Sequence, residues 1–96
     1  MKHVAIIGAG IGGLAAAMRL AHGGVKVTVL ECQATPGGKM RSLPSAAGMI
    51  DAGPTVLTMK PVFDALFCEV GCQLADYATL IQEDILVRHF WCDGTR

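Results

Sequence analysis

The sequence predicts an α/β fold built on a βαβ unit, and three observations carry this prediction. Residues 2–7 form a short, nearly continuous apolar run of the kind that makes a buried central strand. Gly8, Gly10 and Gly13 follow at once with the spacing G-x-G-x-x-G. A second strand pattern ends at an acidic residue, Glu31. Strand, glycines, helix, strand and acid in this order are typical of a Rossmann-like dinucleotide-binding domain.

Each glycine of the turn has a mechanical role. Gly8 lets the chain reverse tightly, Gly10 lets the backbone approach a pyrophosphate, and Gly13 lets the helix lie against the strand. Gly12 lies in the same stretch and is counted with the cofactor-binding residues. The pyrophosphate is expected on free backbone N–H groups at the positive end of the helix dipole, so no cationic side chain is needed there.

The helix is expected at residues 11–21, because apolar residues recur there at helical spacing and Gly23 and Gly24 follow as a stop. Most of its surface is apolar, so the helix should be covered on more than one side. Residues 25–30 then alternate as the second strand. Glu31 at the end of that strand is expected to accept hydrogen bonds from an adenosine ribose and to repel the 2′-phosphate of NADP. The alternative is a glycine-rich turn in an ordinary α/β core, but such a turn gives no reason for an acidic residue at position 31.

Charge and composition narrow the function classes. The 96 residues carry eight basic and eight acidic side chains, and this zero net charge gives no electrostatic footprint for nucleic acid or an anionic membrane surface. A hydrophobic content of 52% and a mean hydropathy of +0.47 are high for one small domain. We therefore expect a truncated piece, residues 1–96, of a larger doubly wound sheet. The N-terminal apolar run imitates a secretory signal, but its glycines argue against both a signal and a membrane-spanning helix.

The cysteines give no metal-binding pattern. Cys32, Cys68, Cys72 and Cys92 form no C-x-x-C pair, and no histidine follows at metal-ligand spacing. We expect these thiols to serve packing or to be incidental in a reducing cytoplasm. No metal site is predicted.

A second glycine block occupies residues 36–41. Gly37 and Gly38 precede two cations, Lys39 and Arg41, which indicates backbone passing close to something negative. A surface turn with solvated charges is the alternative, and taken alone the block favours it. Because the block comes six residues after the acid that ends the second strand, we expect it to cover the same pyrophosphate, with a cation neutralising the phosphates.

The middle of the chain predicts a loop, a strand and a second helix. Residues 42–48 read as a loop or hairpin tip, and residues 49–51 as a short strand ended by the turn of Gly53 and Pro54. Residues 61–70 carry an apolar stripe at helical spacing, which is expected to serve the core and not a cofactor.

The last part of the chain predicts two more strands. Residues 74–77 read as a connection, and residues 79–81 and 86–91 as strands. Asp93 and Gly94 form a strong hairpin-turn signal, yet the strand that should return from it is missing. We therefore expect the chain to stop inside a sheet and to fold poorly by itself.

Three stretches together resemble the FAD-dependent carotenoid desaturases of the phytoene desaturase family. They are residues 4–31, the sequence PGGK at 36–39 and the sequence DAGPTVLT at 51–58. The run at 37–48 is most similar to the hydroxyneurosporene (methoxyneurosporene) desaturases of purple photosynthetic bacteria. Many members of the family have arginine where this chain has Lys39, which keeps the charge but loses the bidentate fork.

This resemblance implies a bound FAD that accepts hydride from an allylic carbon of an acyclic carotenoid, creating a new conjugated double bond. Such carotenoids dissolve in membranes, so the whole enzyme is expected to be cytoplasmic and peripheral to the inner (photosynthetic) membrane. Catalytic groups lie beyond Arg96 in this family. The residues expected at the cofactor are Gly8, Gly10, Gly12, Gly13, Glu31, Gly37, Gly38, Lys39 and Arg41, with Gly53, Pro54 and Thr55 near the flavin ring.

Other readings of these motifs remain open. The first alternative is another two-glycine flavin oxidoreductase, of the phytoene desaturase or amine oxidase type. A nicotinamide dehydrogenase should lack the glycine block at 36–39. A non-enzymatic escort protein of the Rab GDP-dissociation inhibitor type resembles the same fold, but the intact glycine set and Glu31 argue against it.

Overall fold

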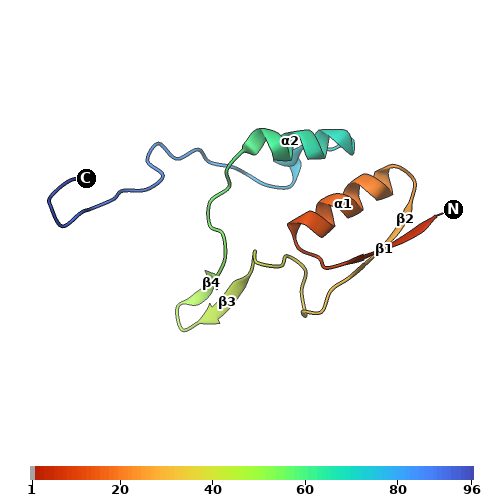
Figure 1. Ribbon diagram of the computed structural model, residues 1–96, viewed down its shortest axis with the longest axis horizontal. Coiled ribbons are helices and arrows are strands. Elements are labelled where there is room, and N and C mark those ends of the chain that lie inside the picture. The colour runs from red at the N-terminus through yellow and green to blue at the C-terminus, as the bar shows by residue number, and fades with distance from the viewer. Residues whose placement is uncertain (1) are drawn as a thin grey trace.

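The computed structural model describes residues 2–96 and contains the predicted βαβ unit (Figure 1). Strand β1 (His3–Ile7) leads through a glycine turn into helix α1 (Ile11–His22), and strand β2 (Lys26–Leu30) follows. The two strands are parallel, and their register runs from the pair of His3 and Lys26 to the pair of Ile7 and Leu30. This arrangement confirms the α/β class, because parallel neighbours joined by a helix form the unit from which Rossmann-like sheets are built.

Helix α1 begins and ends where its glycines allow. Gly10 caps its start with an extended backbone (φ −77°, ψ −178°) and has no side chain to offer a cap hydrogen bond. At the other end the Gly23 N–H donates to the Arg19 carbonyl (3.0 Å), and Gly24 turns the chain with φ +86°. Arg19 and His22 place basic groups in the last turn, where they complement the negative end of the helix dipole.

A β-hairpin follows the βαβ unit. Strands β3 (Ser42–Ser45) and β4 (Gly48–Asp51) pair antiparallel. Residues 42–48 were predicted as a loop or hairpin tip, and a hairpin tip is present between Ser45 and Gly48, but residues 42–45 form a strand that was not predicted. The strand predicted at 49–51 is confirmed. The reason is local. Ser45 Oγ donates to the Gly48 carbonyl (2.6 Å) and accepts from the Ala47 N–H (3.2 Å), which closes a tight turn and brings the flanking residues into register.

The second predicted helix is also present. Helix α2 (Lys60–Glu69) begins after Met59, whose backbone is left-handed (φ 54°). Gly71 (φ +77°) ends it, and the Cys72 N–H donates back to the Phe67 carbonyl (2.8 Å) in the manner of a glycine C-cap. A short 3-10 helix, Leu74–Asp76, lies in the segment predicted as a connection.

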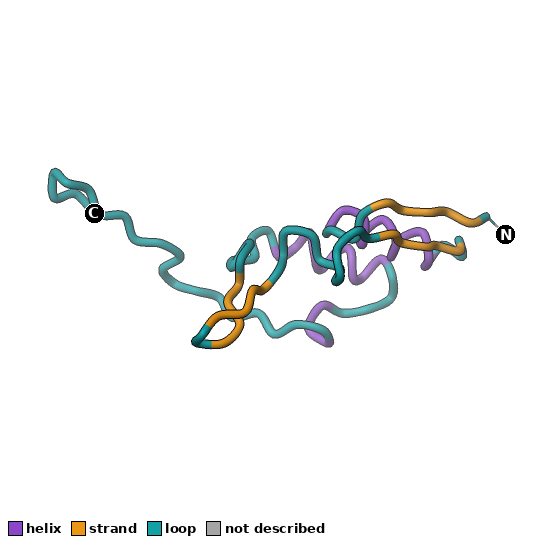
Figure 2. The backbone as a smooth tube through the Cα atoms, turned by 90° about the horizontal axis from the view of Figure 1, so that it is seen from below, coloured by secondary structure: helices purple, strands orange, loops and turns teal. Residues whose placement is uncertain are grey.

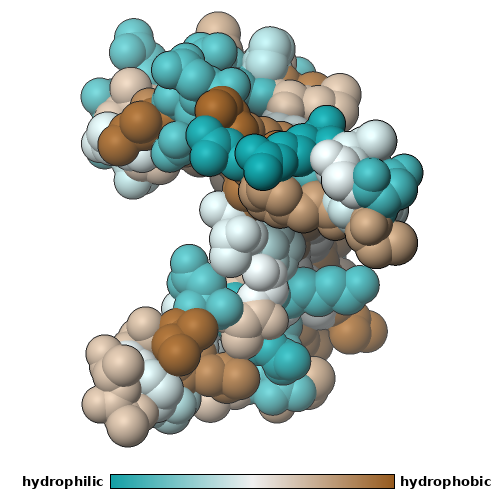
Figure 3. All heavy atoms as spheres, turned by 90° about the vertical axis from the view of Figure 1, so that its left-hand side faces the viewer, coloured by the Kyte–Doolittle hydropathy of each residue, from teal (hydrophilic) through white to brown (hydrophobic). Residues whose placement is uncertain are grey.

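The described chain is elongated and has little core. Its principal extents are 63 × 31 × 24 Å, and its radius of gyration is 17.7 Å, against about 13 Å for a compact domain of 100 residues. Ala9 and Leu66 are the buried hydrophobic residues of the described part, whereas Ile7 at the end of β1 is 89% exposed. Hydrophobic side chains accordingly reach the surface beside hydrophilic ones (Figure 3). Helix α1 has the sheet on one side, but none of its residues is fully buried.

The strands predicted at 79–81 and 86–91 are wrong. This part of the chain leads away from α2 as an extended segment without secondary structure (Figures 1 and 2). Its apolar pattern resembles that of a strand, but a strand also needs a neighbour for its N–H and C=O groups, and residues 2–96 supply none there. The turn predicted at Asp93 and Gly94 is present, since the Gly94 N–H donates to the Trp91 carbonyl (3.0 Å).

Among residues 2–96, no helix has the length and apolar content that crossing a bilayer requires.

Candidate dinucleotide-binding site

The candidate site begins at the glycine turn between β1 and α1. Gly8 has φ +103°, a left-handed conformation that favours glycine, and its N–H donates to the Leu30 carbonyl (2.7 Å). A Cβ at Gly10 or Gly12 would meet no atom within 4 Å, so the start of α1 presents open backbone. Because the first amides of a helix have no intrahelical acceptor, this open surface suits a pyrophosphate.

Gly13 has the packing role that the spacing predicts. A Cβ at this position would lie closer than 3.0 Å to the Gly8 carbonyl oxygen and 3.4 Å from Ile6 Cγ2. Helix α1 can therefore approach β1 this closely only because residue 13 has no side chain. The close approach sets the helix start beside the turn that would receive the ligand.

Glu31 lies beside this turn at the end of β2. One carboxylate oxygen accepts the Ala9 N–H (2.9 Å) and the other accepts the Gln33 N–H (2.9 Å). These two hydrogen bonds, that from Gln33 first, lower the pKa of the Glu31 carboxyl below its ordinary value of 4.5. The group is therefore ionised at neutral pH. Each carboxylate oxygen has two acceptor sites, so the side chain keeps capacity for ribose hydroxyls.

Ala9 joins three parts of the site and was missed by motif reasoning. It is 3% exposed, its N–H donates to Glu31, and its carbonyl accepts the Gly37 N–H (2.8 Å). The G-x-G spacing treats this residue as arbitrary, and its small side chain between two glycines is the one sequence signal for its role. Burial of its methyl group leaves little room for a larger side chain.

The second glycine block meets the first, backbone to backbone. Gly37 (φ +121°) and Gly38 (φ +60°) both adopt left-handed conformations. A Cβ at Gly38 would lie 3.0 Å from Gly10 Cα, and the Met40 N–H donates to the Gly37 carbonyl (3.0 Å). The expected juxtaposition of the two blocks is thus present. The Gly37 amide is used in holding the block to Ala9, so it is not one of the open amides.

The cations of the second block lie next to the hairpin. The Ala52 N–H donates to the Arg41 carbonyl (2.8 Å), and a Cβ at Gly53 would lie closer than 3.0 Å to the Lys39 carbonyl oxygen. Neither cation forms an ion pair with an acidic side chain among residues 2–96. A hollow of about 280 Å³ opens beside Arg41, and it is lined by Met40, Arg41, Ser42, Asp51 and Pro54.

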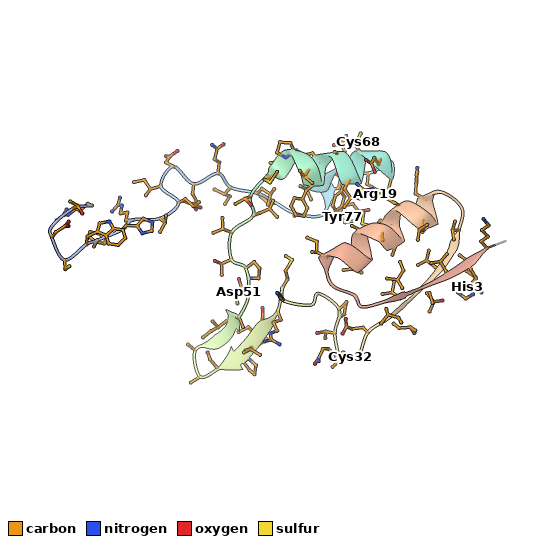
Figure 4. The ribbon with its side chains drawn as sticks, in the orientation of Figure 1. His3, Arg19, Cys32, Asp51, Cys68 and Tyr77 are labelled. Carbon is orange, nitrogen blue, oxygen red and sulfur yellow. The ribbon has the colours of Figure 1, made fainter. Side chains whose placement is uncertain are left out.

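Thr55 and three of the four thiols stay apart from these contacts, whereas the Cys32 thiol donates to the Glu31 carboxylate oxygen (3.6 Å) that also accepts the Gln33 N–H. Thr55 lies on the exposed segment between the hairpin and α2. Cys32 lies in the loop that leaves β2, and Asp51 lies at the end of the hairpin (Figure 4). All four cysteines are free thiols. In the part of the chain that the structure describes, no three His, Cys, Asp or Glu side chains gather as metal ligands.

Comparison with known proteins agrees with this geometry. The sequence model of the NAD(P)-binding Rossmann-like domain family matches residues 6–68. A hydroxyneurosporene desaturase of Cereibacter sphaeroides is 53% identical over 92 residues, which are 96% of this chain and 19% of the relative. The corresponding enzyme of Rhodobacter capsulatus is 52% identical, with the same shares covered. An all-trans-zeta-carotene desaturase of Myxococcus xanthus is 42% identical over 99% of this chain and 18% of its own length.

These matches confirm the resemblance to carotenoid desaturases that the motifs predict, although the chain spans about a fifth of the length of these curated relatives. The family match includes both glycine blocks, Glu31 and most of α2. On this evidence the chain belongs to the family of NAD(P)-binding Rossmann-like domains.

Proposed function

We propose that this chain supplies the cofactor-binding portion of an FAD-dependent oxidoreductase acting on CH–CH bonds, which desaturates an acyclic (hydroxy)carotenoid in carotenoid biosynthesis. One observation carries the cofactor assignment: the backbone of Gly38 packs against that of Gly10 at the open start of α1. The Glu31 carboxylate is held beside the same turn by the Ala9 N–H. The desaturase relatives support the substrate class.

The charge at the end of β2 favours FAD or NAD over NADP. Glu31 is held in its ionised form, and a carboxylate there would repel a 2′-phosphate while accepting hydrogen bonds from ribose hydroxyls. The second glycine block then favours FAD, because a nicotinamide dehydrogenase has no need of it. Lys39 and Arg41 carry positive charge without acidic partners among the described side chains, and they would offset the charge of the pyrophosphate.

The residues of this chain serve binding and orientation in the proposed enzyme. Gly8, Gly10, Gly12 and Gly13 would form the pyrophosphate turn, as the sequence predicts. FAD, when bound, supplies the acceptor for hydride from the allylic carbon of the carotenoid. Of the three residues predicted near the flavin ring, Gly53, Pro54 and Thr55, we keep Pro54 and Thr55 as the proposal for the flavin end of the site. The groups that hold the carotenoid and accept its proton are expected outside residues 1–96.

A membrane-dissolved substrate has a consequence for location. We propose that the whole enzyme works as a peripheral protein at the cytoplasmic face of the inner (photosynthetic) membrane, because acyclic carotenoids reside in the bilayer. The support for this proposal is the chemistry named for the relatives.

The test is an anaerobic reaction of the whole protein with an acyclic 1-hydroxycarotenoid in lipid vesicles, in which the flavin and carotenoid visible bands are followed together. We expect the flavin band to bleach in step with a red shift of the carotenoid. Bound flavin with no movement of either band would point to another two-glycine oxidoreductase, such as a phytoene desaturase or an amine oxidase. Folded protein without flavin would favour the escort class.

A further inference from the structure

Gly53 makes an unusually close backbone contact in the candidate site. A Cβ on this residue would lie closer than 3.0 Å to the Lys39 carbonyl oxygen, 2.9 Å from the Lys39 carbonyl carbon and 3.6 Å from Met40 Cα. These neighbours are all backbone atoms, which cannot swing aside as the end of a side chain can. Gly53 has no left-handed φ, so its own conformation is open to alanine. The requirement for glycine here is therefore one of space and not of backbone freedom.

The same contact is reinforced on the next residue. The Ala52 N–H donates to the Arg41 carbonyl (2.8 Å), so of two consecutive residues, Ala52 is bonded to the backbone of one cation and Gly53 lies against the backbone of the other. The block is also fixed at its other end, where the Gly37 N–H donates to the Ala9 carbonyl (2.8 Å) and Gly38 lies against Gly10. The chain thus stacks three backbone layers: the turn at 8–10, the block at 37–41 and the segment at 52–53.

We infer that Gly53 is a positioning residue that sets the cations of residues 39 and 41 for the pyrophosphate, and that it acts through the Lys39 peptide and not by contact with the flavin ring. This inference rests on the proposed function, because it takes a dinucleotide as the ligand. Where a Cβ would extend from Gly53, the space is already filled by Lys39 backbone, so a ligand cannot approach the glycine from that side. A methyl group there would push the 39–41 backbone away and move both cations.

The experiment compares Gly53→Ala with Gly23→Ala in the whole protein. Gly23 is a matched control, because it also lacks a left-handed φ, its added Cβ would make only ordinary 3.5 Å contacts, and it lies at the far end of α1. Binding of FAD and of ADP-ribose, which has the pyrophosphate but no flavin, is measured by calorimetry at several salt concentrations. Both substitutions are also measured, with both ligands, in protein that already carries Lys39→Gln and Arg41→Gln.

We expect Gly53→Ala to weaken FAD and ADP-ribose alike by about tenfold, the size of one lost charge-assisted contact, and Gly23→Ala to leave both affinities unchanged. The salt dependence of the Gly53→Ala affinity should be shallower, since fewer charges meet the phosphates. In the cation-free background Gly53→Ala should cost less than about twofold, because residues that act through one another are not additive. A general loss of packing would not move the salt dependence or disappear in that background.

Three results would overturn the inference while the proposed function stands: unchanged binding by Gly53→Ala, a loss confined to FAD, or a full loss in the cation-free background. Should Gly53→Ala fail to fold, the Lys39→Gln/Arg41→Gln variant decides. It must lose affinity for both ligands, and unchanged affinity overturns the inference. Wild-type protein that binds neither FAD nor ADP-ribose would instead refute the proposed function.

Discussion

The contact between α1 and β1 predicts opposite effects for the same substitution at adjacent glycines. An added methyl group at Gly13 would collide with the Gly8 carbonyl, whereas one at Gly12 would meet no atom within 4 Å. Alanine in place of glycine within a helix gains about 1 kcal/mol at either position. Overpacking at Gly13 should cost about 1–3 kcal/mol, because the helix must move off the strand. The helix gain cancels in the comparison, so Gly13→Ala should be less stable than Gly12→Ala by about 1–3 kcal/mol.

Amide hydrogen exchange of the ligand-free whole protein measures this difference locally. Peptides covering β1 and α1 should exchange roughly 5- to 150-fold faster in Gly13→Ala than in Gly12→Ala, which is the same free energy expressed as an opening ratio. Peptides from the β3–β4 hairpin provide an internal control and should exchange alike in both variants. Equal protection of β1 in the two variants would refute the close approach of helix and strand.

Three further predictions concern the turn, the acid and the second helix. Gly10→Val should abolish retention of the dinucleotide but keep the wild-type circular dichroism spectrum, because the added side chain enters only open space; retained visible flavin absorbance would contradict it. The pKa of Glu31 is lowered in the folded state, so its stabilising contribution is present above the ordinary value of 4.5 and is lost as the pH falls through the lower folded value. Melting temperatures of wild type and Glu31→Gln should therefore differ at pH 7 and draw together as the pH falls below 4.5, and a gap that does not narrow on acidification would count against the two hydrogen bonds. Met59→Asn should stabilise the protein by about 0.5–1 kcal/mol in thermal unfolding, because asparagine tolerates the left-handed backbone and can cap α2; no gain over Met59→Ala would show that the strain is absent.

The part of the fold that local pattern determines was predictable from the sequence. The bounds of β1, α1 and β2 agree with the pattern to within one residue, because the strand run and the glycine stops act over a few neighbouring positions. A hairpin tip was one of the two predictions for residues 42–48, but strand β3 was not predicted, since a serine side chain that bonds its neighbours is a weaker signal for where a turn begins than glycine or proline. The strands predicted at 79–81 and 86–91 failed because apolar alternation says nothing about whether a partner strand is near.

In the candidate site, too, features set by local sequence were predictable, and contacts between segments remote in sequence were not. Spacing was enough to predict the glycine turn and to place Glu31 beside it, since all of these belong to one βαβ unit. The role of Ala9 could not be predicted, because both of its backbone bonds go to residues remote in sequence. The same holds for the contact of Gly53 with Lys39, which depends on how the hairpin folds back over the second block.

The stacking of backbone on backbone at residues 8–10, 37–41 and 52–53 limits how this region can be recombined with its relatives. A chimera whose crossover falls between Glu31 and Gly37, or between Arg41 and Ala52, joins two layers from different parents. Such a chimera can keep the stack only if both parents have glycine at the meeting points. Crossovers before Gly8 or inside α2 leave the stack in one parental piece. Libraries of desaturase chimeras should therefore retain cofactor more often when residues 8–53 are inherited as a single block.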